Sequence, residues 1–214
     1  MELKGKINAS QIAQCKFAIS GKLTSINCKV GDIIKKGQLL ATLNKIELQA
    51  YLDRSLKQYD LERALFDERQ KENLTEYEKR KYQDSLDISV KNVEIAKTNL
   101  EATDLFSSIN GVVVGIDQCY SGDNITPGGF AVTIVDPTSF YFQAELPEEN
   151  LSQIQIGQTA KITLKAYPEK ILEGKVYLLS FSPVKENIYT LFVSLSLPDP
   201  SNLRLSLSGT ATIT

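Results

Sequence analysis

The chain has 214 residues, and its 24 Lys+Arg against 26 Asp+Glu give a formal net charge of −2. This balance offers no basic excess that would favour nucleic acid or an anionic membrane surface as a partner. The sequence contains no histidine, which removes the commonest general base and the commonest metal ligand, so it predicts no catalytic, metal-binding or cofactor-binding residues.

The sequence predicts no membrane-spanning helix. Its longest apolar runs, residues 111–116 and 130–135, are far shorter than the roughly 20 residues that cross a bilayer. The first residues lack the apolar run of a signal peptide.

Residues 1–44 are predicted to form short strands. Residues 1–20 alternate only weakly between apolar and polar side chains and indicate one or two strands. Residues 21–44 alternate more clearly, with turns at Gly31-Asp32 and Lys36-Gly37.

Residues 45–104 are predicted to form an α-helical hairpin, because residues 38–110 contain neither glycine nor proline. Thr75 and Glu78 have the spacing of a capping box, so a second helix is expected to begin near Thr75. Each arm would be on the order of 40 Å long. Apolar residues at heptad spacing predict the seam between the arms: Leu52, Leu56, Tyr59 and Phe66 in the first, and Leu86, Val90, Val93 and Leu100 in the second.

The pattern of residues 21–44 returns in residues 111–136. Each copy has two glycines six residues apart, an aspartate directly after the first glycine and a cysteine three residues before it: Cys28, Gly31, Asp32 and Gly37, then Cys119, Gly122, Asp123 and Gly128. Tight turns between short strands need residues that accept positive φ, which explains the glycines. We therefore predict that two similar halves pair into one β unit, with the hairpin inserted between them.

Residues 137–214 are predicted to form a small antiparallel β-barrel. Strands are expected at residues 140–146, 160–164, 174–179, 189–195 and 210–213, separated by Pro168, Pro183, Pro198-Asp199-Pro200 and Gly209. A short helix is expected between Pro147 and Gly157, with proline and acids in its first turn.

Residues 31–43, GDIIKKGQLLATL, follow the pattern G-D-x-V/I-K-K-G-Q-x-L-A-x-L, and residues 144–158 and 205–213 carry two further matching segments. In these motifs the chain resembles the membrane fusion proteins, also called periplasmic adaptor subunits or the HlyD-like family, of bacterial efflux pumps and secretion systems. The resemblance implies an α+β fold. Its parts would be a lipoyl-like domain (barrel-sandwich hybrid) from residues 1–44 and 105–136, the hairpin of residues 45–104 and a β-barrel domain of residues 137–214. For residues 1–20, the resemblance leaves two assignments, to the lipoyl-like domain alone or shared with the barrel.

The resemblance also implies a function. The chain would be a non-enzymatic adaptor that links an inner-membrane transporter to an outer-membrane exit duct or to the cell envelope. It would be periplasmic or extracytoplasmic, held at the membrane by a segment outside this chain, and would assemble as a ring, often of six copies. Leu61, Leu65, Ile88 and Ile95 fall roughly opposite the seams and form an expected inter-subunit face, with scattered surface aliphatics as the alternative.

Some features depart from the family or leave alternatives open. Family members that dock on a TolC-like duct carry Arg, Leu and Ser at the hairpin tip. Arg69, Leu74 and Thr75 are the nearest match here, with compressed spacing and threonine in place of serine, and solvated tip residues without a docking role are the alternative. A lipoyl or biotinyl carrier domain is the alternative function, since it shares the two-half design and Lys45 lies near the junction. For the cysteines, small buried thiols and a Cys28–Cys119 disulfide both remain open.

Overall fold

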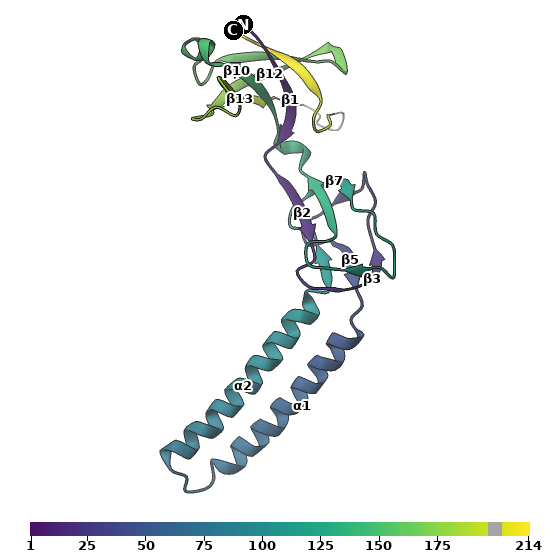
Figure 1. Cartoon of the computed structure of the whole chain (residues 1–214), viewed down its shortest axis with the longest axis vertical. Helices are drawn as coiled ribbons and strands as arrows, with labels where there is room; N and C mark the ends of the chain where they lie inside the picture. Colours follow the sequence, from purple (N-terminus) through teal and green to yellow (C-terminus); the bar gives the residue numbers. More distant parts are fainter. Residues whose placement is uncertain (197–202) are drawn as a thin grey trace. The chain divides into compact units, whose positions relative to one another are not determined.

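The computed structural model describes residues 1–196 and 203–214. The chain divides into two compact units. The first, called the barrel unit below, comprises residues 1–13, 109–112 and 134–214, and the second, the hairpin unit, comprises residues 14–108 and 113–133. Figure 1 shows the chain with labels on both α-helices and on several of the strands.

The barrel unit is a closed antiparallel barrel with the strand order β1-β10-β13-β12-β11-β14. Its strands are β1 (Glu2–Ala9), β10 (Phe140–Pro147), β11 (Thr159–Leu164), β12 (Tyr167–Leu179), β13 (Ile188–Leu195) and β14 (Ser208–Ile213). The N-terminal strand closes the barrel, because β1 pairs with β10 on one side (Ile7 opposite Phe142) and with β14 on the other (Leu3 opposite Ala211). The first strand of the chain is thus held by partners far away in the sequence.

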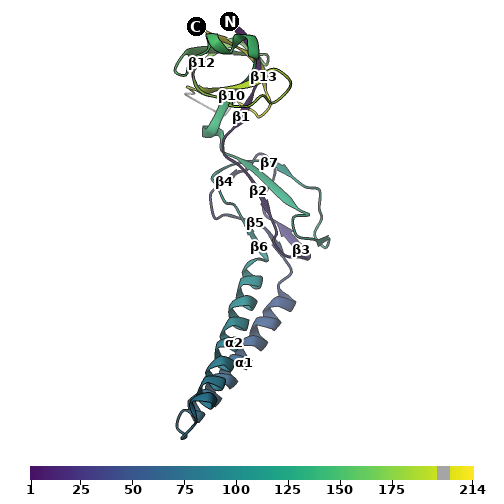
Figure 2. The same ribbon diagram turned by 60° about the vertical axis from the view of Figure 1, so that its left-hand side comes forward.

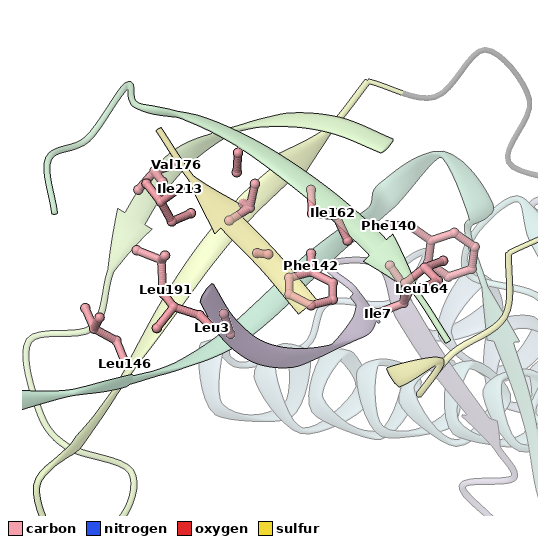
Figure 3. Packing of buried hydrophobic residues seen from close by; sticks show 14 of the residues in the cluster. Leu3, Ile7, Phe140, Phe142, Leu146, Ile162, Leu164, Val176, Leu191 and Ile213 are labelled. Carbon is pink, nitrogen blue, oxygen red and sulfur yellow. The ribbon is translucent and has the colours of Figure 1, made fainter. Parts of the chain in front are cut away.

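The barrel encloses an apolar core that follows from the alternation of its strands. Ile7, Phe142 and Ile162 are each at most 1% exposed, and Figure 3 shows them inside the barrel among side chains from neighbouring strands. Every second side chain of a strand points to the same face, so a regular alternation buries one face of each strand. Two short 3-10 helices, η1 (Pro137–Ser139) and η2 (Glu148–Gln153), complete the unit, and η2 lies where the sequence predicts a short helix.

Two expected strand separators lie inside strands. Pro168 is the second residue of β12, between the positions Tyr167 and Ile171 that pair with β11, where the register is irregular. A proline is tolerated in such a place because it interrupts no regular ladder. Gly209 belongs to β14, where it pairs with Gly5. Pro183 lies between β12 and β13 as expected, whereas Pro198-Asp199-Pro200 lie outside the described residues.

The remaining strands form two sheets, each built from both copies of the sequence repeat. One sheet has the order β2-β9-β7-β4 and the other β6-β5-β3-β8. Strands β2 (Ile12–Lys16), β3 (Gly21–Ile26), β4 (Ile33–Ile34) and β5 (Leu39–Leu43) precede the helices. Strands β6 (Asp104–Phe106), β7 (Gly111–Ile116), β8 (Asn124–Ile125) and β9 (Ala131–Val135) follow them. Since each sheet takes two strands from either side of the helices, the two sequence stretches form one body, which confirms the predicted fold class.

The repeat glycines lie in turns of matching conformation. Gly31 and Gly122 have φ of 98° and 101°, and Gly37 and Gly128 have φ of 80° and 74°. Side chains disfavour such angles, so glycine suits all four turns. In each copy the aspartate side chain closes the first turn: Asp32 Oδ2 accepts a 2.8 Å hydrogen bond from the Lys29 N–H, and Asp123 Oδ2 accepts one of 2.8 Å from the Tyr120 N–H.

The turn of each copy is held by the other copy. The Gly31 N–H donates to the Val113 carbonyl at 2.8 Å, and the Gly122 N–H donates to the Leu23 carbonyl at 2.8 Å. These reciprocal bonds hold the two halves together.

Candidate functional site

The hairpin consists of α1 (Ile46–Arg69) and α2 (Glu76–Glu101), which lie side by side in both views (Figure 1 and Figure 2). Side chains spaced alternately four and three residues apart are buried or half-buried along each helix, as in a coiled coil. They are Leu48, Leu52, Ser55, Tyr59, Glu62, Phe66 and Arg69 on α1, and Tyr82, Leu86, Ser89, Val93, Ala96 and Leu100 on α2. We call this set the seam.

Six of the eight residues assigned to the seam from sequence lie in it, and the other two do not. Leu56 is 41% exposed, and its neighbour Ser55 occupies the seam position at 8% exposure. Val90 is half-buried beside the seam position Ser89. In both helices the predicted seam residue is a large apolar one, Leu56 or Val90. The residue that the seam actually contains is the small one directly before it, Ser55 or Ser89.

Small residues let the two helices come close at three seam positions. Ala96 is 0% exposed, Ser89 is 3% exposed, and Ser55 is similarly buried. The distance between packed helices depends on the side chains at the contact, so small residues permit a close approach. The buried hydroxyls are satisfied within their own helices: Ser55 donates to the Tyr51 carbonyl at 3.0 Å and Ser89 to the Leu86 carbonyl at 2.7 Å. The sequence signal for Ser55, Ser89 and Ala96 is their place in the alternating four- and three-residue spacing of the seam.

The residues of the expected inter-subunit face are all exposed. Leu61 is 66% exposed, Leu65 38%, Ile88 62% and Ile95 55%. At 100° per residue, Leu61, Ile88 and Ile95 lie on the sides of α1 and α2 that face away from the seam, whereas Leu65 lies at the flank of the seam. The hairpin therefore presents large aliphatic side chains to its surroundings on both helices.

The tip of the hairpin combines charge, a helix cap and a cavity. The Arg69 guanidinium pairs with the Glu72 carboxylate at 3.0 Å, and this carboxylate raises the pKa of Arg69. Arg69 and Leu74, two of the three tip residues predicted from sequence, line a cavity of about 590 Å³ together with Phe66 and Tyr82.

The third predicted tip residue, Thr75, caps α2. Its hydroxyl accepts a 3.3 Å hydrogen bond from the Glu78 N–H, and its own N–H donates to the Glu78 carboxylate at 2.9 Å. These two bonds confirm the predicted capping box. The bonds from the Thr75 N–H and then from its hydroxyl lower the pKa of Glu78.

The base of the hairpin is closed by contacts between its two ends. The Leu43 N–H donates to the Thr103 carbonyl at 2.8 Å, and the Lys45 ammonium pairs with the Asp104 carboxylate at 2.6 Å. Lys45 is also the residue directly before α1. A carrier lysine must stand free at a hairpin tip to swing its cofactor, so an ion-paired lysine at a helix start does not fit that chemistry.

The three cysteines, including Cys28 and Cys119 of the considered disulfide, are free thiols in the structure. Each of these two cysteines lies before the turn of its own copy of the repeat. Cys28 is 6% exposed with its sulfur 3.8 Å from the Leu40 carbonyl oxygen, whereas Cys119 is half-buried. Burial is the main cause that raises the pKa of both thiols, which lowers their reactivity.

The described residues contain neither a membrane-spanning helix nor a cluster of metal ligands. Among residues 1–196 and 203–214, no helix is long and apolar enough to cross a bilayer. Across the same residues, no three His, Cys, Asp or Glu side chains gather in a way that could hold a metal ion.

Comparison with known proteins identifies relatives of the barrel and of the whole fold. Residues 141–213 match the family model of the CusB-like β-barrel domain. The membrane fusion protein Spr0693 from Streptococcus pneumoniae R6 is 23% identical, with a TM-score of 0.83 over 100% of this chain and 98% of that chain. ZneB from Cupriavidus metallidurans is 19% identical, with a TM-score of 0.68 over 100% of this chain and 97% of that chain.

A third solved structure includes a hairpin from another protein. The MacA–MexA chimeric protein, which contains the Pseudomonas aeruginosa MexA α-hairpin domain, is 17% identical, with a TM-score of 0.90 over 100% of this chain and 80% of that chain. At these identities the likeness is one of fold. Together with the barrel match, it confirms the resemblance to membrane fusion proteins.

Proposed function

We propose that this chain, which has the fold of membrane fusion proteins and a CusB-like barrel, is a non-enzymatic adaptor of a bacterial transporter. The observation that carries the proposal is the hairpin inserted between the two halves of one β body, with Leu61, Ile88 and Ile95 more than half exposed on its outer faces. Large exposed aliphatic side chains on a helix pair favour protein neighbours over solvent. The hairpin would then be the part that contacts other proteins.

The partner in the membrane would be an inner-membrane transporter of an efflux pump or secretion system. The chain would act on the outer side of that membrane. With one methionine and no histidine, the chain lacks the methionine or histidine clusters expected of an adaptor that handles soft or borderline metal ions. Cargo selection would therefore belong to the transporter.

Assembly would bring copies of the chain side by side in a ring, hexamer-like as in the family. The outer faces of α1 and α2 would contact neighbouring hairpins through Leu61, Leu65, Ile88 and Ile95. The tip would meet an outer-membrane duct or another part of the envelope through Arg69, Leu74 and Thr75. In this arrangement the Arg69–Glu72 pair competes with any partner for the arginine.

A charge placed on the outer face tests the proposal. We expect Ile95→Asp to keep the helix content of the isolated protein but to reduce ring assembly in membranes and export of the transporter's substrate. The matched control is Gln49→Glu, which adds the same charge at an exposed position of α1 on a different side of the helix from Leu61 and Leu65. Normal assembly and export in the Ile95→Asp variant would exclude this face as a working surface.

A further inference from the structure

The loop between β12 and β13, residues 180–187, carries a fully exposed aromatic side chain. Phe181 is 101% exposed and Val184 is 66% exposed, and Tyr177 and Leu178 near the end of β12 are 43% and 41% exposed. Four large apolar side chains within eight residues thus face solvent at one end of the β12–β13 hairpin. We call residues 177–184 the apolar loop segment.

Backbone hydrogen bonds hold the loop in one conformation. The Ser180 N–H donates to the Thr190 carbonyl at 2.9 Å, and the Val184 N–H donates to the Ile188 carbonyl at 2.9 Å. The Lys185 ammonium pairs with the Glu145 carboxylate on β10 at 2.9 Å. Because the loop is already ordered, binding through it costs little conformational entropy.

A β-bulge extends the apolar surface from the loop onto the outside of the barrel. The register of β12 against β13 shifts between Val176 and Leu178, and both Tyr177 and Leu178 are exposed. The Tyr177 ring lies 6.2 Å from the Phe192 ring and 6.4 Å from the Tyr141 ring. Bulges redirect side chains in this way near sites of interaction.

The exposed carboxylates around the loop favour a partner with basic side chains. Glu186 is exposed in the loop, and Glu148 and Glu149 are exposed in η2, which the loop contacts through the bond from the Glu148 N–H to the Asn187 carbonyl at 2.9 Å. The loop's lysine is already paired with Glu145, so the surroundings are acidic. Carboxylates disfavour an anionic lipid surface. They also disfavour a contact between the same loops of two copies, which would set two acidic rims against each other, and the head-to-tail contact between ring neighbours is already proposed for the outer faces of the hairpin.

We infer that the apolar loop segment is a docking element that inserts Phe181 into an apolar pocket with a basic rim on the extracytoplasmic side of the transporter. This inference rests on the proposed function and adds a defined contact to it. Phe181 supplies the apolar anchor, Val184 widens it, and the three exposed glutamates orient it toward lysine or arginine side chains.

The test uses the full chain and the transporter that co-purifies with it from native membranes. We expect Phe181→Ser to weaken binding to that purified transporter at least tenfold, whereas Ile171→Ser, which alters an isoleucine 62% exposed elsewhere on β12, leaves binding unchanged. The double variant Glu148→Lys with Glu149→Lys should weaken binding as well. Circular dichroism of each variant checks that the barrel is folded.

Several results would overturn the inference. Unchanged transporter binding by Phe181→Ser would exclude the docking element while leaving the adaptor function intact, whereas recovery of no transporter with the wild-type chain would remove both. A membrane role would appear as binding to vesicles of phosphatidylglycerol and phosphatidylcholine in equal parts, lost with Phe181→Ser and strengthened by the two lysines. A self-contact would appear as concentration-dependent dimers that Phe181→Ser abolishes.

Discussion

Replacing Ala96 with leucine tests whether the two helices are closely packed. Ala96 is 0% exposed on the seam side of α2, and the substitution adds three carbon atoms there. If an open space faced Ala96, the added carbons would stabilise the hairpin by about 2 kcal/mol, at about 0.8 kcal/mol for each buried methylene. Because α1 covers Ala96, we expect overpacking instead, with a loss of about 1–3 kcal/mol. The sign of the change therefore reports on the packing.

Native-state hydrogen exchange measures this loss locally. A change of 1.4 kcal/mol is about a tenfold change in an equilibrium constant, so protected amides of α1 and α2 should exchange roughly fivefold to a hundredfold faster. Amides of the barrel should not change. Ala50→Leu, at an exposed position of α1, is the matched control and should leave exchange unaltered. Slower exchange in Ala96→Leu, or equal exchange in both variants, would refute the close seam.

Three further predictions concern the tip, a turn and a thiol. Thr75→Ala removes the capping hydroxyl and should raise the pKa of Glu78 toward its ordinary value, as measured by NMR titration. In the wild type the cap is present at neutral pH, and it is lost as the pH falls through the lowered pKa of Glu78. Gly31→Ala should lower the free energy of unfolding by about 1–2 kcal/mol in denaturant melts, because φ is 98° there, whereas Gly115→Ala, which meets only ordinary contacts, should be nearly neutral. Cys28 should resist a thiol reagent until the protein unfolds, since it is buried with a raised pKa; rapid labelling of the native protein would contradict its burial.

The local features of the fold could be predicted because they depend on short stretches of sequence. The turns at Gly31 and Gly122 follow from glycine and aspartate at fixed spacing, and both glycines have positive φ. The start of α2 follows from Thr75 and Glu78, whose side chains form the expected reciprocal bonds. In each case the physical cause lies within a few residues of its effect.

The features that could not be predicted depend on distant or small residues. The role of β1 in closing the barrel requires partners near residues 142 and 211, and a weak alternation cannot identify them. The seam positions Ser55 and Ser89 carry little apolar surface, so the heptad pattern of large apolar side chains predicts their neighbours Leu56 and Val90 instead. Phe181 has no periodic context, and only its exposure in the folded protein distinguishes it from a core residue.

Deleting the hairpin tests the central claim that this part of the chain does the adaptor's work. The Leu43 N–H lies 2.8 Å from the Thr103 carbonyl oxygen, so a short glycine-serine linker can replace residues 45–101 without disturbing either sheet. In cells whose only copy carries this deletion, we predict normal levels of folded protein and loss of export of the transporter's substrate. Export at the wild-type rate would contradict the account.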